Sequence, residues 1–157
     1  MVAAQTIYFI RHGEKDKSSG SDLDAQGYQR ADCLANSVFA GSNPTFKSPD
    51  TIIAQDPAQH SSRSEETVTP LAQALGLSIQ DNVDRDDVQG AVDLINNDIS
   101  NGSQIILLAW EHQVLGDIAA NFISGDAPTY PGDHFDIVWV VDVPSKTYTL
   151  AYENCGF

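Results

Sequence analysis

The chain has 157 residues, about the size of one domain, and we expect a single domain over residues 1–157. It is 41% hydrophobic and 19% charged, an ordinary globular composition that argues against intrinsic disorder. Lys and Arg number 8 against 22 Asp and Glu, a formal net charge of -14. Nucleic acids and anionic membranes are therefore not expected partners.

Strand patterns alternate with helix patterns along the chain. β-branched and aromatic residues at Thr6–Ile10 predict a first strand, and Asp24 is a suitable N-cap for the helix after it. The most apolar run, Gln104–Trp110, is expected to be central in a sheet. In chain order we predict strand 6–10, helix 25–35, strand 51–54, helices 64–75 and 91–99, strand 104–110, helix 114–123, and strands 135–143 and 147–152.

This order predicts an α/β fold. We expect a three-layer α/β/α sandwich with a mostly parallel sheet, to which the last two strands add an antiparallel edge. In open α/β sheets, ligands bind beyond the C-terminal ends of the strands. The residues that follow each strand are therefore the first place to look for a site.

Basic side chains follow three of the predicted strands. Arg11 and His12 end the first strand, His60 and Arg63 follow the second, and His112 follows the apolar strand. Two arginines and two histidines at one edge would form a small cationic pocket in an acidic protein. Guanidinium groups match phosphate oxygens bidentately, and a neutral imidazole can attack phosphorus. The pattern indicates phosphate chemistry.

The two cysteines and the acidic loop give no metal site. Cys33 and Cys155 cannot build a zinc site alone, and the loop 81–87 lacks the ligand spacing of a calcium loop. We expect no metal and no cofactor, and two free thiols in a reducing compartment, with a single disulfide left open. No signal peptide or apolar run of membrane-spanning length is seen, and a cytoplasmic location is expected. The oligomeric state stays open.

Four segments together carry a family resemblance. They are "RHGEK" at 11–15, "LDAQGYQRA" at 23–31, "RSEETVTPLA" at 63–72, and His112 after the apolar strand. In this order they resemble the histidine phosphatase superfamily, which has the phosphoglycerate mutase-like fold. The combination of "DRDD" at 84–87, "WEH" at 110–112 and "ENC" at 153–155 is similar to a small filamentous-fungal group of that family.

The resemblance implies roles for the basic residues. His12 would be the nucleophile that becomes phosphorylated, while Arg11 and Arg63 would hold the transferring phosphoryl group. His112 would form another wall of the pocket. Glu111 is interpreted as lying outside the core site, because strand alternation would point it away from His112.

The general acid is expected from the acidic loop. In many members of the family a carboxylic acid there protonates the leaving alcohol, so Asp86 is the first choice and Asp84 the second. Asp87 could instead cap the next helix. Glu14 is a further candidate for the acid or for a substrate contact. His60 and His134 match no motif, although the segment 129–135 is a plausible rim of the substrate site.

These features predict a metal-independent phosphatase that hydrolyses a phosphomonoester through phosphorylated His12. The expected substrate is a phosphorylated small molecule or a phosphoprotein. Hydrolysis is favoured over mutase action because the chain is close in length to the minimal core of the superfamily that it resembles. Its site should therefore be open to water. The alternatives are a phosphohistidine-protein phosphatase, a mutase-type phosphotransferase, and a non-catalytic phosphate- or phosphoprotein-binding module.

Overall fold

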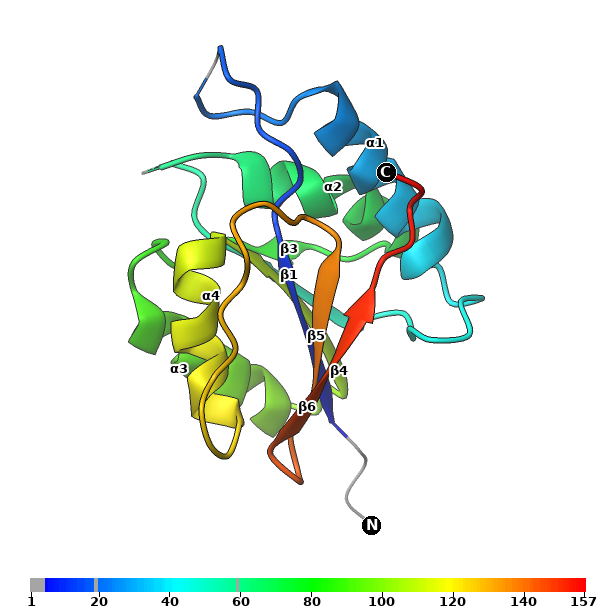
Figure 1. Cartoon of the computed structure of the whole chain (residues 1–157). Helices are drawn as coiled ribbons and strands as arrows, with labels where there is room; N and C mark the ends of the chain where they lie inside the picture. The colour runs from blue at the N-terminus through cyan, green and yellow to red at the C-terminus, as the bar shows by residue number, and fades with distance from the viewer. Residues whose placement is uncertain (1–4, 19, 59) are drawn as a thin grey trace.

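The structure is a computed structural model and describes residues 5–18, 20–58 and 60–157. Strands and helices alternate over most of its length (Figure 1). In chain order they are β1 (Thr6–Arg11), α1 (Ala25–Cys33), a π-helical turn η1 (Leu34–Val38), β2 (Thr51–Ala54), α2 (Arg63–Leu75), β3 (Ile79–Gln80), α3 (Val88–Ser100), β4 (Ile105–Trp110), α4 (His112–Ala119), a 3-10 turn η2 (Ala120–Phe122), β5 (Ile137–Asp142) and β6 (Thr147–Tyr152).

One six-stranded sheet has the order β3-β2-β4-β1-β5-β6. The strands β3, β2, β4 and β1 run parallel, whereas β5 runs antiparallel to both β1 and β6. The predicted α/β fold with a mostly parallel sheet and an antiparallel edge is confirmed. The tight hairpin between β5 and β6 contains Lys146 at φ 57, a left-handed backbone conformation.

Helices cover both faces of the sheet (Figure 1). Because side chains alternate along a strand, β1 supplies both cores. Ile7 and Phe9 lie in the core shared with α3 and α4, while Tyr8 and Ile10 lie in the core shared with α2 and η1. Burying each such side chain contributes about 1.5–3 kcal/mol. The strand therefore fixes the position of Arg11 and His12, which follow directly on it.

Several predicted bounds differ from the structure. The strand β3 is two residues long, too short for an alternating pattern, and was not predicted. The helix α3 begins at Val88 rather than 91, because Asp87 caps it through a 2.9 Å bond from the Gly90 N–H. The helix α4 begins at His112 rather than 114, which changes the geometry of the site.

A disulfide joins Cys33 to Cys155, so the expectation of two free thiols is wrong. Cys33 is the last residue of α1, and Cys155 lies in the tail after β6. The two are 122 residues apart in sequence, and nothing local in the sequence shows that the tail returns to α1. The bond attaches the C-terminal tail to the helix that follows the "RHGEK" segment.

A buried ion-pair cluster lies next to this disulfide. Arg30 of α1 is 2% exposed and donates to both carboxylate oxygens of Glu14, at 2.9 and 2.8 Å. Its third nitrogen donates to Glu153 in the tail at 2.9 Å. The cluster holds the segment after His12, the helix α1 and the tail together. Removing one partner from a buried ion pair is strongly destabilising, because the other charge is left uncompensated.

Among the described residues, no helix combines the length and the apolar character that crossing a membrane requires.

Candidate active site

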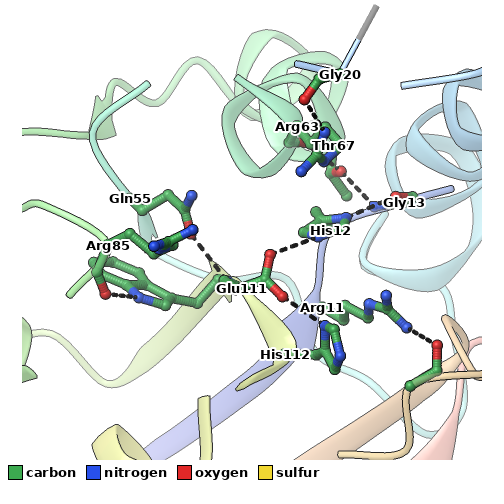
Figure 2. Close-up of polar contacts among 12 residues, drawn as sticks. Arg11, His12, Gly13, Gly20, Gln55, Arg63, Thr67, Arg85, Glu111 and His112 are labelled. Atoms are coloured by element: carbon green, nitrogen blue, oxygen red, sulfur yellow. Dashed lines mark hydrogen bonds and ion pairs between the residues drawn. The ribbon is translucent and has the colours of Figure 1, made fainter. Parts of the chain in front are cut away.

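The C-terminal ends of the central strands bring the polar residues together (Figure 2). In the sheet register Arg11 is paired with Trp110, and Ala54 with Ala109. His12, Gln55 and Glu111 therefore leave the sheet at the same edge. This is the edge at which open α/β sheets bind ligands.

His12 is fully buried and its ring is held at both nitrogens. Nδ1 lies 2.8 Å from the Gly13 carbonyl oxygen, and Nε2 lies 3.3 Å from Oε2 of Glu111. A carbonyl oxygen only accepts, so Nδ1 carries a proton and donates it. Nε2 is therefore the nitrogen that can act on a ligand.

The backbone around Gly13 packs closely on two helices. The Gly13 N–H donates to Oγ1 of Thr67 at 2.8 Å, and this hydroxyl donates to the Arg63 carbonyl at 2.7 Å. A Cβ at Gly13 would lie 3.1 Å from the backbone of Gly27 in α1, so a side chain would push the two segments apart. Thr67 thus connects the His12 loop to the start of α2, where Arg63 lies.

Arg11 is 2% exposed and partly tied to backbone. Its Nη1 donates to the carbonyls of Gly132 and His134, at 2.9 and 2.7 Å, and its guanidinium lies 3.9 Å above the Phe135 ring. Its buried Nε–H has no hydrogen-bond partner among the residues that the structure describes. Burial lowers the pKa of Arg11, and nearby Arg63 acts in the same direction. A bound anion would offset both effects.

Arg63 shows the same arrangement. Its Nη1 donates to the Gly20 carbonyl at 2.8 Å, while its Nε–H is buried and has no hydrogen-bond partner within the described ranges 5–18, 20–58 and 60–157. Buried polar groups are nearly always paired, with protein or with another partner. Two cationic N–H groups left unpaired beside a buried histidine indicate an anion site.

Glu111 belongs to the site, so the prediction that it points away from His112 is wrong. Glu111 is the N-cap of α4, with extended backbone angles, and His112 is already helical. Strand alternation therefore ends one residue too early to separate them. Glu111 Oε1 lies 2.6 Å from Nδ1 of His112, and Oε2 faces His12. The residue links the two histidines (Figure 2).

The charges around Glu111 are mainly positive. Burial opposes ionisation of this carboxyl, but His12, His112 and Arg11 outweigh it and lower the pKa of Glu111 to about 2. Burial also lowers the pKa of His112, with Arg11 contributing in the same direction. The Gln55 Oε1 accepts from the Glu111 N–H at 2.9 Å, while Gln55 Nε2 is buried and finds no partner in the described part of the chain.

The acidic loop lies beside the site but its carboxylates are engaged elsewhere. Asp86 bonds to Arg85 at 3.1 and 3.2 Å, its side chain is 57% exposed, and Arg85 lowers its pKa. Asp84 accepts from the Asp86 N–H at 3.0 Å and pairs with His60 at 3.2 Å. The structure thus offers no poised proton donor in Asp86 or Asp84.

The remaining predicted residues have structural partners. Both carboxylate oxygens of Glu14 bond to Arg30, so Glu14 is part of the ion-pair cluster and does not face His12 as an acid. Asp87 caps α3, as its alternative interpretation predicted. In the predicted rim 129–135, backbone carbonyls and Phe135 hold Arg11.

Two clusters in the described residues have a spacing that suits a metal ion. One consists of His12, Glu111 and His112, and the other of His60, Asp84 and Asp86. Arg11 lies close to Glu111 and His112 of the first cluster, and its positive charge disfavours a cation there. The second is open to solvent, with Arg85 already bound to one of its carboxylates.

Two cavities adjoin the site. One of about 410 Å³ lies between α4 and the segment 127–130 and includes His112, Gln113 and Asp117 in its wall. Another, of about 300 Å³, is lined by Lys15, Asp16, Lys17, Gly20 and Arg63. The first cavity is thus bordered by His112 and the second by Arg63.

Glu65, in the first turn of α2, has a neighbouring carboxyl in Asp81. Burial and the hydrogen bond with Asp81 raise the pKa of Glu65 from 4.5 to about 7. The folded state then binds this proton more tightly than the unfolded chain. Its stabilising contribution is complete below a pH of about 4.5 and is lost as the pH rises through about 7.

We therefore expect the free energy of unfolding to depend less on pH in Glu65→Gln than in wild type. The free energy of unfolding of wild type should fall relative to the variant between a pH of about 4.5 and about 7. Urea denaturation at a series of pH values measures this. Asp32→Asn, an exposed change on α1, is the control. Parallel profiles for wild type and Glu65→Gln would contradict the expectation.

No protein-family model matches this chain, and the comparison with curated proteins found no match. Solved structures do match over nearly the whole chain. The protein histidine phosphatase SixA, solved with tungstate, has a TM-score of 0.68 at 17% identity, covering 94% of this chain and 95% of that one. The α-ribazole phosphatase of Shigella flexneri has a TM-score of 0.64 at 15% identity, covering 94% and 95%.

A phosphoserine phosphatase variant of Entamoeba histolytica, solved with phosphoserine, has a TM-score of 0.62 at 10% identity and covers 97% of this chain and 98% of that one. At such identities the likeness establishes the fold, while the similarity to a fungal group stays a prediction. The chain has the phosphoglycerate mutase-like fold of the histidine phosphatases.

Proposed function

We propose that this protein is a metal-independent phosphatase that hydrolyses a phosphomonoester through a phosphohistidine on His12. The observation that carries the proposal is that the described part of the chain offers no partner to the buried Nε–H groups of Arg11 and Arg63, in the same region as the buried ring of His12. Two guanidinium donors suit the oxygens of a phosphoryl group, and the imidazole supplies a nucleophile.

The proposed reaction has two steps. Nε2 of His12 attacks phosphorus, the P–O bond to the alcohol breaks, and phosphorylated His12 forms. Arg11 and Arg63 donate to the phosphoryl oxygens and offset the charge that develops on them. Water then attacks phosphorus, the P–N bond breaks, and inorganic phosphate leaves. The Nδ1–H bond to Gly13 keeps the same ring nitrogen facing phosphorus in both steps.

The substrate class is a phosphorylated small molecule or a phosphoprotein. The cavities beside His112 and beside Lys15 and Lys17 leave the site open to water, which favours hydrolysis over transfer to a second substrate. The similar proteins are a protein histidine phosphatase, an α-ribazole phosphatase and a phosphoserine phosphatase. A phosphohistidine protein is therefore a candidate to test beside small esters, and mutase-type transfer is a further alternative.

One observation favours a second candidate, a non-catalytic phosphate- or phosphoprotein-binding module. The carboxylates of Asp84 and Asp86 are engaged by His60 and Arg85, so the predicted acid is not poised. A pocket of this kind would still bind phosphate through Arg11 and Arg63.

The disulfide also changes the expected location. Disulfides persist in oxidising compartments and are rare in the cytosol. The bond between Cys33 and Cys155 therefore favours an oxidising compartment over the cytoplasmic location predicted from free thiols.

A substrate panel with a chelator present tests the proposal. Phosphate release is measured for alkyl and aryl phosphomonoesters, phosphoserine, and a phosphohistidine peptide, and phosphate binding is measured by calorimetry. We expect turnover of at least one ester in the chelator, with competitive inhibition by vanadate. Phosphate binding without turnover of any ester would support the non-catalytic module and reject the phosphatase.

A further inference from the structure

The contact between His12 and Glu111 requires a proton. Because Nδ1 of His12 donates to the Gly13 carbonyl, Nε2 is a bare acceptor when the ring is neutral. Oε2 of Glu111, only 3.3 Å away, is also an acceptor when the carboxyl is ionised. Two lone pairs at this distance in a buried site would repel each other. One proton must therefore lie between the two side chains, on one or the other.

The surroundings determine which side chain holds that proton. Glu111 is 9% exposed, and it faces His12 on one oxygen and His112 on the other. The charges of Arg11 and Arg85 add to the positive field around it. These groups keep the carboxyl ionised when no anion is bound, so the proton rests on the histidine side. The pKa of Glu111, lowered to about 2, agrees with this geometry.

A phosphate ester would reverse the preference. Its oxygens would bind the free Nε–H groups of Arg11 and Arg63, which places two negative charges beside Glu111. A like charge at close range favours the protonated form of a carboxyl. The proton then passes from Nε2 to Glu111 at the moment when Nε2 needs its lone pair for attack.

We propose that Glu111 is the proton carrier of the reaction, acting as acid in the first step and as base in the second. This inference rests on the proposed phosphatase activity and supplies the proton donor that the acidic loop does not offer. Asp86 is exposed and bonded to Arg85, whereas Glu111 lies against the reacting nitrogen. Gln55 holds the Glu111 backbone in place through the 2.9 Å bond.

The protons balance through the cycle. Nε2 gives its proton to Glu111, then forms the bond to phosphorus, and the alkoxide that leaves takes the proton from Glu111. In the second step the Glu111 carboxylate takes a proton from water as the water oxygen bonds to phosphorus and the P–N bond breaks. Glu111 finally returns the proton to Nε2. The sum is ester plus water giving alcohol plus hydrogen phosphate.

Two esters that differ in their leaving group can distinguish a proton-carrier role of Glu111 from a purely structural role. An alkyl phosphate needs a proton on its leaving oxygen, whereas nitrophenolate leaves without one. We expect Glu111→Gln to lower kcat/KM for an alkyl phosphate by roughly 10²–10⁴-fold, the usual contribution of general acid catalysis. For nitrophenyl phosphate the loss in kcat/KM should stay under about tenfold, because only the later hydrolysis needs the base. Phosphohistidine should therefore accumulate in this variant, and nitrophenolate should be released in an initial burst.

Two further variants serve as controls. Glu111→Asp keeps the carboxyl on a shorter stem and should recover part of the activity on the alkyl ester. Asp86→Asn should change kcat/KM for either ester by less than about twofold, because the Asp86 carboxylate is solvated. Circular dichroism confirms that each variant is folded.

Each outcome has one consequence. The proton-carrier role would be overturned if Glu111→Gln lowered kcat/KM equally for both esters, or if Asp86→Asn lowered kcat/KM for the alkyl ester alone. In either case wild-type turnover would still support the phosphatase. Wild-type turnover that a chelator removes and Zn²⁺ restores would also overturn it, because His12, Glu111 and His112 would then be metal ligands. Absence of turnover in wild type on any ester would reject the phosphatase itself.

Discussion

Replacing His12 by alanine is expected to lower turnover of the best phosphomonoester by roughly 10⁴–10⁶-fold, as loss of a covalent nucleophile does in other enzymes. The reason is geometric. His12 is fully buried and directly follows Arg11 in the chain, and its Nδ1 bond to Gly13 fixes which ring nitrogen attacks. Steady-state kinetics with phosphate release measures the loss.

The binding half of the site should survive this change. Arg11 and Arg63 are held by Gly132, His134 and Gly20 backbone, not by His12, so His12→Ala should still bind inorganic phosphate. His60→Ala is the matched control, because His60 pairs with loop carboxylates at the surface. It should keep activity within about twofold. Substantial turnover in His12→Ala would show that another group is the nucleophile.

Removing the disulfide is expected to cause a large loss in the free energy of unfolding. The bond closes a loop between residues 122 positions apart, and the chain-entropy relation gives about 4–5 kcal/mol for a loop of that size. Native domains are stable by only about 5–15 kcal/mol, so this loss is a large fraction of the total. The double variant of Cys33→Ser and Cys155→Ser should therefore unfold at a clearly lower denaturant concentration.

A reductant provides the comparison within one protein. Dithiothreitol should lower the unfolding midpoint of wild type to near that of the double variant, and should leave the variant unchanged. Thiol labelling of unfolded wild type should find no free thiol before reduction and two after it, from Cys33 and Cys155. A midpoint that reduction does not move would contradict the stabilising role of the bond.

The architecture could be predicted from the sequence because strand and helix patterns are local. The strands at 51–54 and 147–152 match their predicted bounds, and the basic residues after the central strands meet at one edge as expected. The strand β3 was not predicted, because two residues show no alternation.

The side-chain contacts within the site could not be predicted from local sequence patterns. Strand alternation predicts the wrong side for Glu111 because α4 begins one residue after it, and periodicity locates the start of a helix only to within a few residues. An acidic N-cap position immediately before a motif histidine is the signal that could have found it. Glu14 looked like a candidate acid because its partner Arg30 is 16 residues away, on the next helix.

The proposed function depends on phosphorylation of His12, which rapid-quench trapping of the phosphoenzyme can detect. Wild type is mixed with a labelled aryl phosphate, quenched in base within the first turnover, and digested. The expected result is acid-labile, base-stable phosphate on the peptide that contains His12, at up to one per chain and absent in His12→Ala. Turnover without any trapped phosphate, or phosphate on a different residue, would contradict the proposed function.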